Sequence, residues 1–178
     1  MSRPIDVVVI HCSASAWGDV DEIRRWHMLP PPKGRGWRDV GYHYVIVGPY
    51  PSWRAWKEQA PDAESDGDVQ LGRDLDRDGD VDEEIGAHLP EVNRTGIGIC
   101  LVGPPFSAAQ LEAGVALAAR LCRKYQLGPS QVRGHREYAS GAHKECPALD
   151  IHDFRRRVAL ALLEPTSPPV PPGCAAGP

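Results

Sequence analysis

Two short, uninterrupted apolar runs, 5–11 (IDVVVIH) and 96–102 (GIGICLV), constrain the fold of this chain most strongly. Each run is continuous, short and free of regular polar alternation, so each predicts a strand that is buried within a sheet. Further strands are predicted over 41–47 (GYHYVIV), over 69–73 (VQLGR) as its hairpin partner, and over 131–133 (QVR). The sequence therefore predicts one central sheet that is covered on both faces.

Segments with helical periodicity lie between and after these strands. Asp19 is placed to cap a helix over 19–28, and a capping box that begins at Ser107 opens another over 108–126. A third helix is predicted over 151–163, where apolar residues recur at helical spacing. We therefore expect an α/β protein with a single domain, in which helices flank a central mixed β-sheet.

The chain length and its irregular segments predict the domain boundaries. The 178 residues, 42% of them hydrophobic, suffice for one domain with a sizeable core, which we place at 1–163. Within it, 48–68 is expected to be an insertion loop on the surface, and 74–84 is an acidic loop. The Pro-rich tail at 164–178 cannot propagate a helix or a sheet and is predicted to be disordered.

Charge and hydropathy exclude several classes of protein. The net charge of −4 argues against a dedicated nucleic-acid binder, which usually carries a basic face. No apolar run approaches the roughly 20 residues that span a bilayer, so we expect no membrane insertion. The first apolar run is followed by no cleavage site, which predicts cytoplasmic synthesis without a signal peptide. We also expect a monomer.

The cysteine pattern does not indicate a disulfide framework. The chain has five cysteines, an odd number, with wide spacing and no secretory context. Cys100 and Cys122 lie in apolar segments and are predicted to be small buried side chains, while Cys174 lies in the tail. Only Cys146 has polar neighbours that are suited to a metal.

Three side chains form a candidate metal site. His11 ends the first strand, His135 follows the strand at 131–133, and Cys146 lies on the loop before the last helix. Two imidazoles and one thiolate can hold a zinc ion and leave a fourth position open, as in catalytic zinc sites. By spacing alone the signal is weak, because a histidine at a strand end more often packs and a lone loop cysteine is more often inert. The flanking motifs supply the further support.

These motifs occur in one order along the chain: VIHCSAS (9–15), EIRRWH (22–27), GWRDVGYHYVI (36–46), QLGRDLD (70–76), GAH (86–88), NRTGIGICLVG (93–103), GHRE (134–137) and KECPALD (144–150). Together they resemble the zinc-dependent N-acetylmuramoyl-L-alanine amidases of the phage-lysozyme type, whose fold is shared by peptidoglycan-recognition proteins. The resemblance covers about residues 5–160. It implies one zinc ion held by His11, His135 and Cys146, a catalytic Tyr42 in the GYH motif, and a catalytic Lys144. The bond that such enzymes cleave joins the lactyl group of N-acetylmuramic acid to the first L-alanine of the stem peptide.

The chemistry of amide hydrolysis agrees with these roles. The ammonium of Lys144 would stabilise a developing negative charge, and the phenol of Tyr42 is a hydrogen-bond donor at neutral pH. The best carboxylate is Glu137, either as a base or as a group that orients a ligand histidine. The simpler interpretations are that Tyr42 packs on a strand face that it shares with Tyr44, and that Lys144 is a solvated surface charge.

Two other histidines need an interpretation. His88, in the GAH motif, is a candidate for lining the substrate cleft rather than for binding metal. His27 falls on the apolar side of its helix and is interpreted as a core histidine with a satisfied hydrogen bond.

Two features depart from a minimal member of this family. Trp53 and Trp56 in the insertion would stack on sugar rings or contact a partner, or else cover a local patch of core. Asp74, Asp76 and Asp78 match the first positions of an EF-hand loop, which predicts Ca²⁺ binding, although the glutamate expected at the last position is absent. The alternative is a charged, solvated turn.

The sequence thus predicts a peptidoglycan hydrolase, specifically a phage or prophage endolysin that reaches the wall through a holin or after lysis. A cytoplasmic amidase that recycles muropeptides has the same chemistry. A peptidoglycan-recognition module without activity is expected to lack a zinc ligand, and none is missing here. A cysteine hydrolase would use Cys146 as its nucleophile and His135 as its base.

Overall fold

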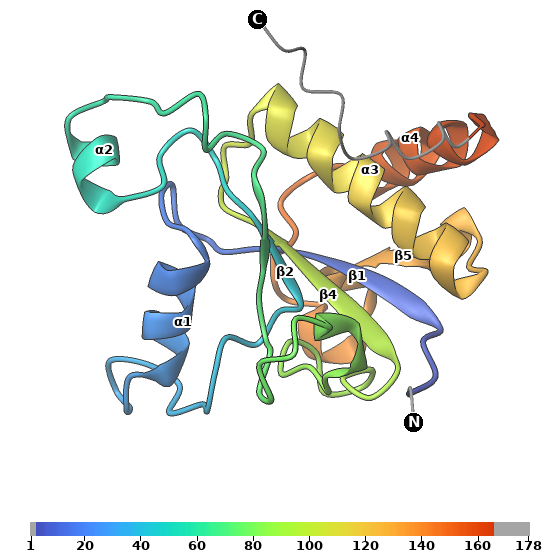
Figure 1. The fold of residues 1–178 in the computed structure, drawn as a ribbon, viewed down its shortest axis with the longest axis horizontal. Coiled ribbons are helices and arrows are strands. Elements are labelled where there is room, and N and C mark those ends of the chain that lie inside the picture. The colour runs from blue at the N-terminus through green and yellow to red at the C-terminus, as the bar shows by residue number, and fades with distance from the viewer. Residues whose placement is uncertain (1–2, 166–178) are drawn as a thin grey trace, which may run out of the picture.

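The computed structural model describes residues 3–165, so most of the predicted tail at 164–178 lies outside the described residues. Five strands form one mixed sheet in the order β3-β2-β4-β1-β5 (Figure 1). Parallel pairs join β1 (Val7–Cys12) to β4 (Gly96–Leu101) and β5 (Val132–Gly134), and β4 to β2 (Tyr44–Ile46). The edge strand β3 (Val69–Leu71) runs antiparallel to β2. All five predicted strands are present, and the mixed sheet is confirmed.

The two uninterrupted apolar runs occupy the centre of the sheet. Every residue of β1 and β4 is buried, which explains why neither run alternates with polar residues. In the parallel register His11 lies beside Cys100, at the carboxyl end of both strands. This placement brings the first candidate ligand to the edge of the sheet where loops converge.

Helices cover both faces of the sheet (Figure 1). On one face α3 (Ala108–Tyr125) and α4 (Ile151–Leu163) pack through Val115, Phe154 and Val158 against alternate residues of the central strands. On the other face α1 (Val20–Met28) inserts Ile23 against Cys100. The 3₁₀ turns are Val81–Glu83, Pro129–Gln131, His135–Glu137 and Ala139–Gly141. None of the helices in residues 3–165 is long and apolar enough to cross a membrane.

The predicted capping residues begin the helices. Asp19 accepts a hydrogen bond from the backbone N–H of Glu22 at the start of α1. Ser107 and Gln110 form the capping box of α3. Gln110 also reaches under the sheet, where its buried amide donates to the carbonyl oxygen of Val102 at 2.8 Å. The start of α3 is therefore tied both to its own backbone and to the end of β4.

The structure corrects two expectations about local structure. The 48–68 insertion contains a short helix, α2 (Trp53–Lys57), where the sequence indicated only a loop. Tyr42 and Tyr44 do not share a face, because Tyr42 precedes β2 and packs near α1, whereas Tyr44 is buried among the residues under α3. The simple alternation of a strand does not extend to a residue outside that strand.

The acidic 74–84 loop is attached to the body of the protein through Asp82. This buried carboxylate accepts hydrogen bonds from the phenols of Tyr44 and Tyr125, both at 2.6 Å, and from the ammonium of Lys124 at 2.8 Å. Burial alone would raise the pKa of Asp82, but these hydrogen bonds outweigh it and hold the pKa below its ordinary value.

Candidate metal centre and active site

The three predicted ligands converge at the carboxyl end of β1. The Nδ1 atom of His11 lies 3.2 Å from Nδ1 of His135 and 3.8 Å from Sγ of Cys146. All three ligand atoms lie within 4.8 Å of one another. Because β1 and β5 are parallel neighbours, His11 and the residue just after β5 reach the same edge of the sheet. The backbone N–H of Cys12 donates to Sγ of Cys146 at 3.3 Å and holds the sulfur beside the imidazoles.

The electrostatics of these groups suit a divalent cation. Burial, followed by neighbouring histidines, lowers the pKa of His11 well below its usual value, and burial with Lys144 lowers the pKa of His135. Both imidazoles are therefore neutral at neutral pH, which is the form that binds metal. The neighbouring Cys12 and burial raise the pKa of the Cys146 thiol. A thiolate in this place needs a compensating positive charge, which a metal ion provides.

His88 orients the first ligand from behind, a role that the sequence did not reveal. Its Nδ1 atom lies 3.0 Å from Nε2 of His11, and both rings are buried. Since Nδ1 of His11 faces the other two predicted ligands, the tautomer that suits metal binding carries its proton on Nε2, and this N–H donates a hydrogen bond to Nδ1 of His88. Gly86 and Gly98 make room for the His88 ring, because a Cβ atom at either position would lie 2.5 or 2.7 Å from it. The sequence suggested that His88 lines the substrate cleft, but the buried ring lies behind His11 and is not among the lining residues of the cavity described next.

A cavity of 370 Å³ opens in front of the ligands, and Tyr42 and Lys144 both line it. The ring centroid of Tyr42 lies 5.1 Å from that of His11. Burial, and then the adjacent cysteines, raise the pKa of Tyr42 well above its usual value, so its phenol keeps its proton. Lys144 is exposed at the rim of the cavity. The sequence analysis did not single out Arg35 and Glu145, which also line this cavity. Glu145 lies between Lys144 and Cys146 in the KECPALD motif, which was a signal for it, whereas no motif marks Arg35.

His27 is also a lining residue of this cavity, which corrects its interpretation as a core histidine. Its Nδ1 atom does accept a hydrogen bond from the backbone N–H of Gly41 at 3.0 Å. Burial, followed by the charge of Arg35, lowers the pKa of His27 to about 4. The ring is thus neutral, lies beside Tyr42 with centroids 5.4 Å apart, and has one edge on the cavity.

The sequence suggested Glu137 as a base or as a group that orients a ligand histidine, and the structure places it where it supports the turn that carries His135. Its carboxylate accepts from the backbone N–H of Gly134 at 2.7 Å and pairs with Arg155 at 2.9 Å. Both the ion pair and the hydrogen bond lower the pKa of Glu137 although burial opposes them. The pair ties the turn that carries His135 to α4, and so positions a ligand through the backbone.

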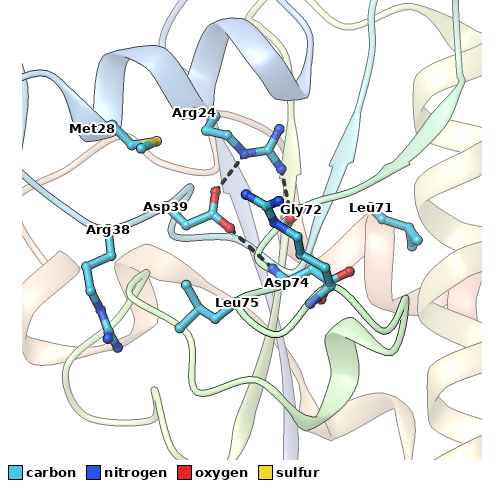
Figure 2. A pocket seen from close by; sticks show the side chains of 9 residues that line it. Arg24, Met28, Arg38, Asp39, Leu71, Gly72, Asp74 and Leu75 are labelled. Atoms are coloured by element: carbon cyan, nitrogen blue, oxygen red, sulfur yellow. Dashed lines mark hydrogen bonds and ion pairs between the residues drawn. The ribbon is translucent and has the colours of Figure 1, made fainter.

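A second cavity, of 460 Å³, lies between α1 and the segment after β3 and shares no lining residue with the first (Figure 2). Two of its charged groups, Arg24 and Asp39, are paired with each other. Arg24 donates to Asp39 at 2.6 Å and to the carbonyl oxygen of Gly72 at 3.0 Å, and Asp39 also accepts from the backbone N–H of Asp74. These contacts join α1 to the sheet edge, and we assign this cavity a structural role.

The carboxylates of Asp74, Asp76 and Asp78 lie within 4.8 Å of one another. Each accepts a hydrogen bond from a backbone N–H within the same turn, with Gly79 donating to Asp74 at 3.1 Å. These bonds account for the shape of the turn without an ion, and clusters of exposed acidic groups are common. Calcium binding therefore stays a prediction, which calorimetric titration of the metal-stripped protein with Ca²⁺ would test; an absence of heat would remove it.

Comparison with known proteins agrees with this geometry. A family model described as N-acetylmuramoyl-L-alanine amidase matches residues 1–149. The endolysin of Escherichia phage T7 is 32% identical over 158 residues, which cover 82% of each chain. The endolysin of Klebsiella phage KP32 is 33% identical over 156 residues, 81% of each chain.

Solved structures share the fold. The N-acetylmuramoyl-L-alanine amidase LysC from Clostridium intestinale URNW aligns with a TM-score of 0.63 at 21% identity, over 88% of this chain and 86% of that chain. Wild-type Drosophila PGRP-LB aligns with a TM-score of 0.54 at 26% identity, over 83% and 76%. Sequence, fold and the convergence of two histidines with a cysteine lead to one conclusion: the chain belongs to the N-acetylmuramoyl-L-alanine amidase family.

Proposed function

We propose that this protein hydrolyses the amide between N-acetylmuramic acid and L-alanine in peptidoglycan with one zinc ion, and that it acts as a phage or prophage endolysin. Family membership and the endolysin relatives support the peptidoglycan hydrolase activity. The observation that carries the zinc proposal is the convergence of His11, His135 and Cys146 behind a cavity that Tyr42 and Lys144 also line. Release to the wall through a holin, or after lysis, is part of the proposal.

The donor set fits zinc. Neutral imidazoles and a thiolate are the ligands that zinc prefers, and three protein ligands leave room for water or substrate. When bound, a zinc ion in such a site supplies a Lewis acid and a water of lowered pKa. The softness of the thiolate disfavours magnesium and calcium, which bind through oxygen.

The residues around the cavity account for the rest of the reaction. Tyr42 keeps its proton, because burial raises the pKa of its phenol, and it therefore donates a hydrogen bond to the oxygen of the attacked carbonyl. Lys144 places a positive charge at the rim, where it stabilises the same developing negative charge. The departing amine takes its proton from one of these two donors.

A cysteine hydrolase is less well supported. A reactive cysteine has a lowered thiol pKa. Here the neighbouring Cys12 and burial raise the pKa of Cys146. The position of Cys146 beside two neutral imidazoles suits a metal ligand better than a nucleophile.

Digestion of purified peptidoglycan tests the proposal. The wild-type protein is expected to release free N-terminal L-alanine, and Cys146→Ser is expected to release none and to lose its zinc. New reducing ends in place of N-terminal alanine would show a glycosidase. Activity that survives a strong chelator but not thiol alkylation would favour the cysteine hydrolase.

Two further substitutions separate binding of zinc from catalysis. Tyr42→Phe and Lys144→Gln are expected to keep the zinc and to lower kcat by about 10²–10³, as loss of one donor to a developing oxyanion does. Tyr50→Phe, which removes a phenol from the exposed insertion, is the matched control and should keep wild-type activity. Full activity of Tyr42→Phe would exclude the role given to its phenol.

A further inference from the structure

A third cavity lies away from the ligands, between the start of α1 and the insertion helix α2, which occupy the same side of the molecule (Figure 1). Its volume is 650 Å³, and we call it the α1–α2 cleft. Its walls include Trp17, Asp19, Glu22, Arg25, Trp53 and Arg54. Half of the Trp53 surface is exposed, and the ammonium of Lys57 lies 4.7 Å from the centroid of its ring.

The walls of the α1–α2 cleft are held in place before any ligand binds. The backbone N–H of Gly18 donates to the carbonyl oxygen of Tyr50 at 3.0 Å and joins the segment after β1 to the insertion. The far end of the insertion is tied down by Asp66, which accepts from the hydroxyl of Ser107 at 2.6 Å. Trp17 packs edge-on against Trp26 with ring centroids 5.2 Å apart. Trp17 and the backbone on both sides of the cleft are therefore preorganised, which lowers the entropic cost of binding.

We propose that the α1–α2 cleft binds the glycan strand of peptidoglycan, a chain of N-acetylated hexosamines, as a subsite outside the reaction cavity. Indole rings are large, flat and apolar, and they pack against the apolar C–H face of a pyranose ring. Carboxylates and guanidinium groups around them hydrogen-bond the hydroxyl and acetamido groups at its edge. This proposal rests on the proposed function, because it takes peptidoglycan as the substrate.

The charge of the cleft favours the glycan over the stem peptide. Three carboxylates, of Asp19, Asp21 and Glu22, face two guanidinium groups, of Arg25 and Arg54. Arg25 is already paired with Glu22. The cleft thus has no excess of positive charge to attract an anionic peptide, whereas an uncharged sugar loses little by entering it.

The cleft is close enough to the reaction cavity for one polymer to occupy both. Ser13 and Ala14 line the reaction cavity, and Trp17 lines the α1–α2 cleft. Trp17 is three positions after Ala14 in the chain, and a stretch of this length spans at most about 10 Å. A glycan strand whose peptide-bearing sugar lies at the ligands therefore passes within reach of the tryptophans.

The test compares Trp53→Ala with Trp56→Ala. Trp56 lies on the same short helix and is partly exposed, but it does not line the cleft, so it is the matched control. The first measurement is binding of a peptide-free oligomer of N-acetylglucosamine, followed by NMR on the full chain. The second is the ratio of kcat/KM on polymeric peptidoglycan to kcat/KM on a single muropeptide.

Trp53→Ala is expected to weaken oligomer binding about tenfold and to lower the ratio of kcat/KM values by a similar factor, while Trp56→Ala matches the wild type. Loss of one stacking contact gives a change of this size. Equal binding and equal ratios for the two variants and the wild type would overturn the proposal. Oligomer binding needs no turnover, so a protein that binds through Trp53 but does not release alanine would refute the amidase function alone.

Discussion

Replacement of His88 by alanine tests whether a buried histidine behind the metal site determines metal affinity. Nδ1 of His88 accepts a hydrogen bond from the Nε2–H of His11 at 3.0 Å, and His11 is fully buried. In His88→Ala that N–H has no partner, and an unpaired buried donor costs about 1–3 kcal/mol. Loss of a partner that orients a metal ligand typically weakens metal binding about 10- to 100-fold, which at about 1.4 kcal/mol per factor of ten is the same range.

The assay is competition for zinc against a chromophoric chelator at fixed pH. Thermal unfolding of the metal-free protein, followed by circular dichroism, separates the loss of affinity from the loss of packing that the smaller side chain causes. His152→Ala, at an exposed position of α4, is the matched control and should bind zinc as the wild type does. If folded His88→Ala also binds zinc with wild-type affinity, the orienting role of His88 is wrong.

Three further predictions follow from individual contacts. Asp82→Asn removes the charge that pairs with Lys124, and chemical denaturation should show a loss of about 1–3 kcal/mol in the free energy of unfolding; an unchanged midpoint would contradict the anchoring role. Gly141→Ala places a Cβ atom 2.1 Å from the carbonyl oxygen of His135, so zinc titration should show weaker binding, and wild-type affinity would disprove the clash. Burial lowers the pKa of His43 to about 4, below the unfolded value near 6.5, so the unfolded chain binds the proton first. The contribution of neutral His43 to the free energy of unfolding should therefore be complete above pH 6.5 and should fall by about 3 kcal/mol towards pH 4. Denaturation curves measured over this pH range should show a smaller loss of stability for His43→Gln than for the wild type, and an equal loss would contradict the assignment.

The elements with strong local signals were predictable from the sequence. The runs that became β1 and β4 are buried along their whole length, so their composition alone distinguishes them from strands with one wet face. The capping box at Ser107 and the cap at Asp19 are short-range hydrogen bonds, which depend only on neighbouring residues. The insertion helix α2 escaped prediction because five residues are too few to show helical periodicity.

For the reaction cavity, too, part of the description was predictable from the sequence and part was not. His11, His135, Cys146, Tyr42 and Lys144 lie in motifs whose order and spacing along the chain resemble one family, so their candidacy needed no coordinates. Their protonation states depend on the fold, because burial and neighbouring charges determine each pKa, and the neighbours are residues distant in the sequence.

Local periodicity and the chemistry of each side chain were enough to predict the sheet, the main helices and the residues able to bind a metal. The contact of His88 with His11 and the pairing of Glu137 with Arg155 became visible only in the folded protein. The same holds for Trp17 and Trp53, which line one cleft. Such contacts join positions far apart in the chain, and the packing of strands and helices, which no short stretch encodes, brings them together.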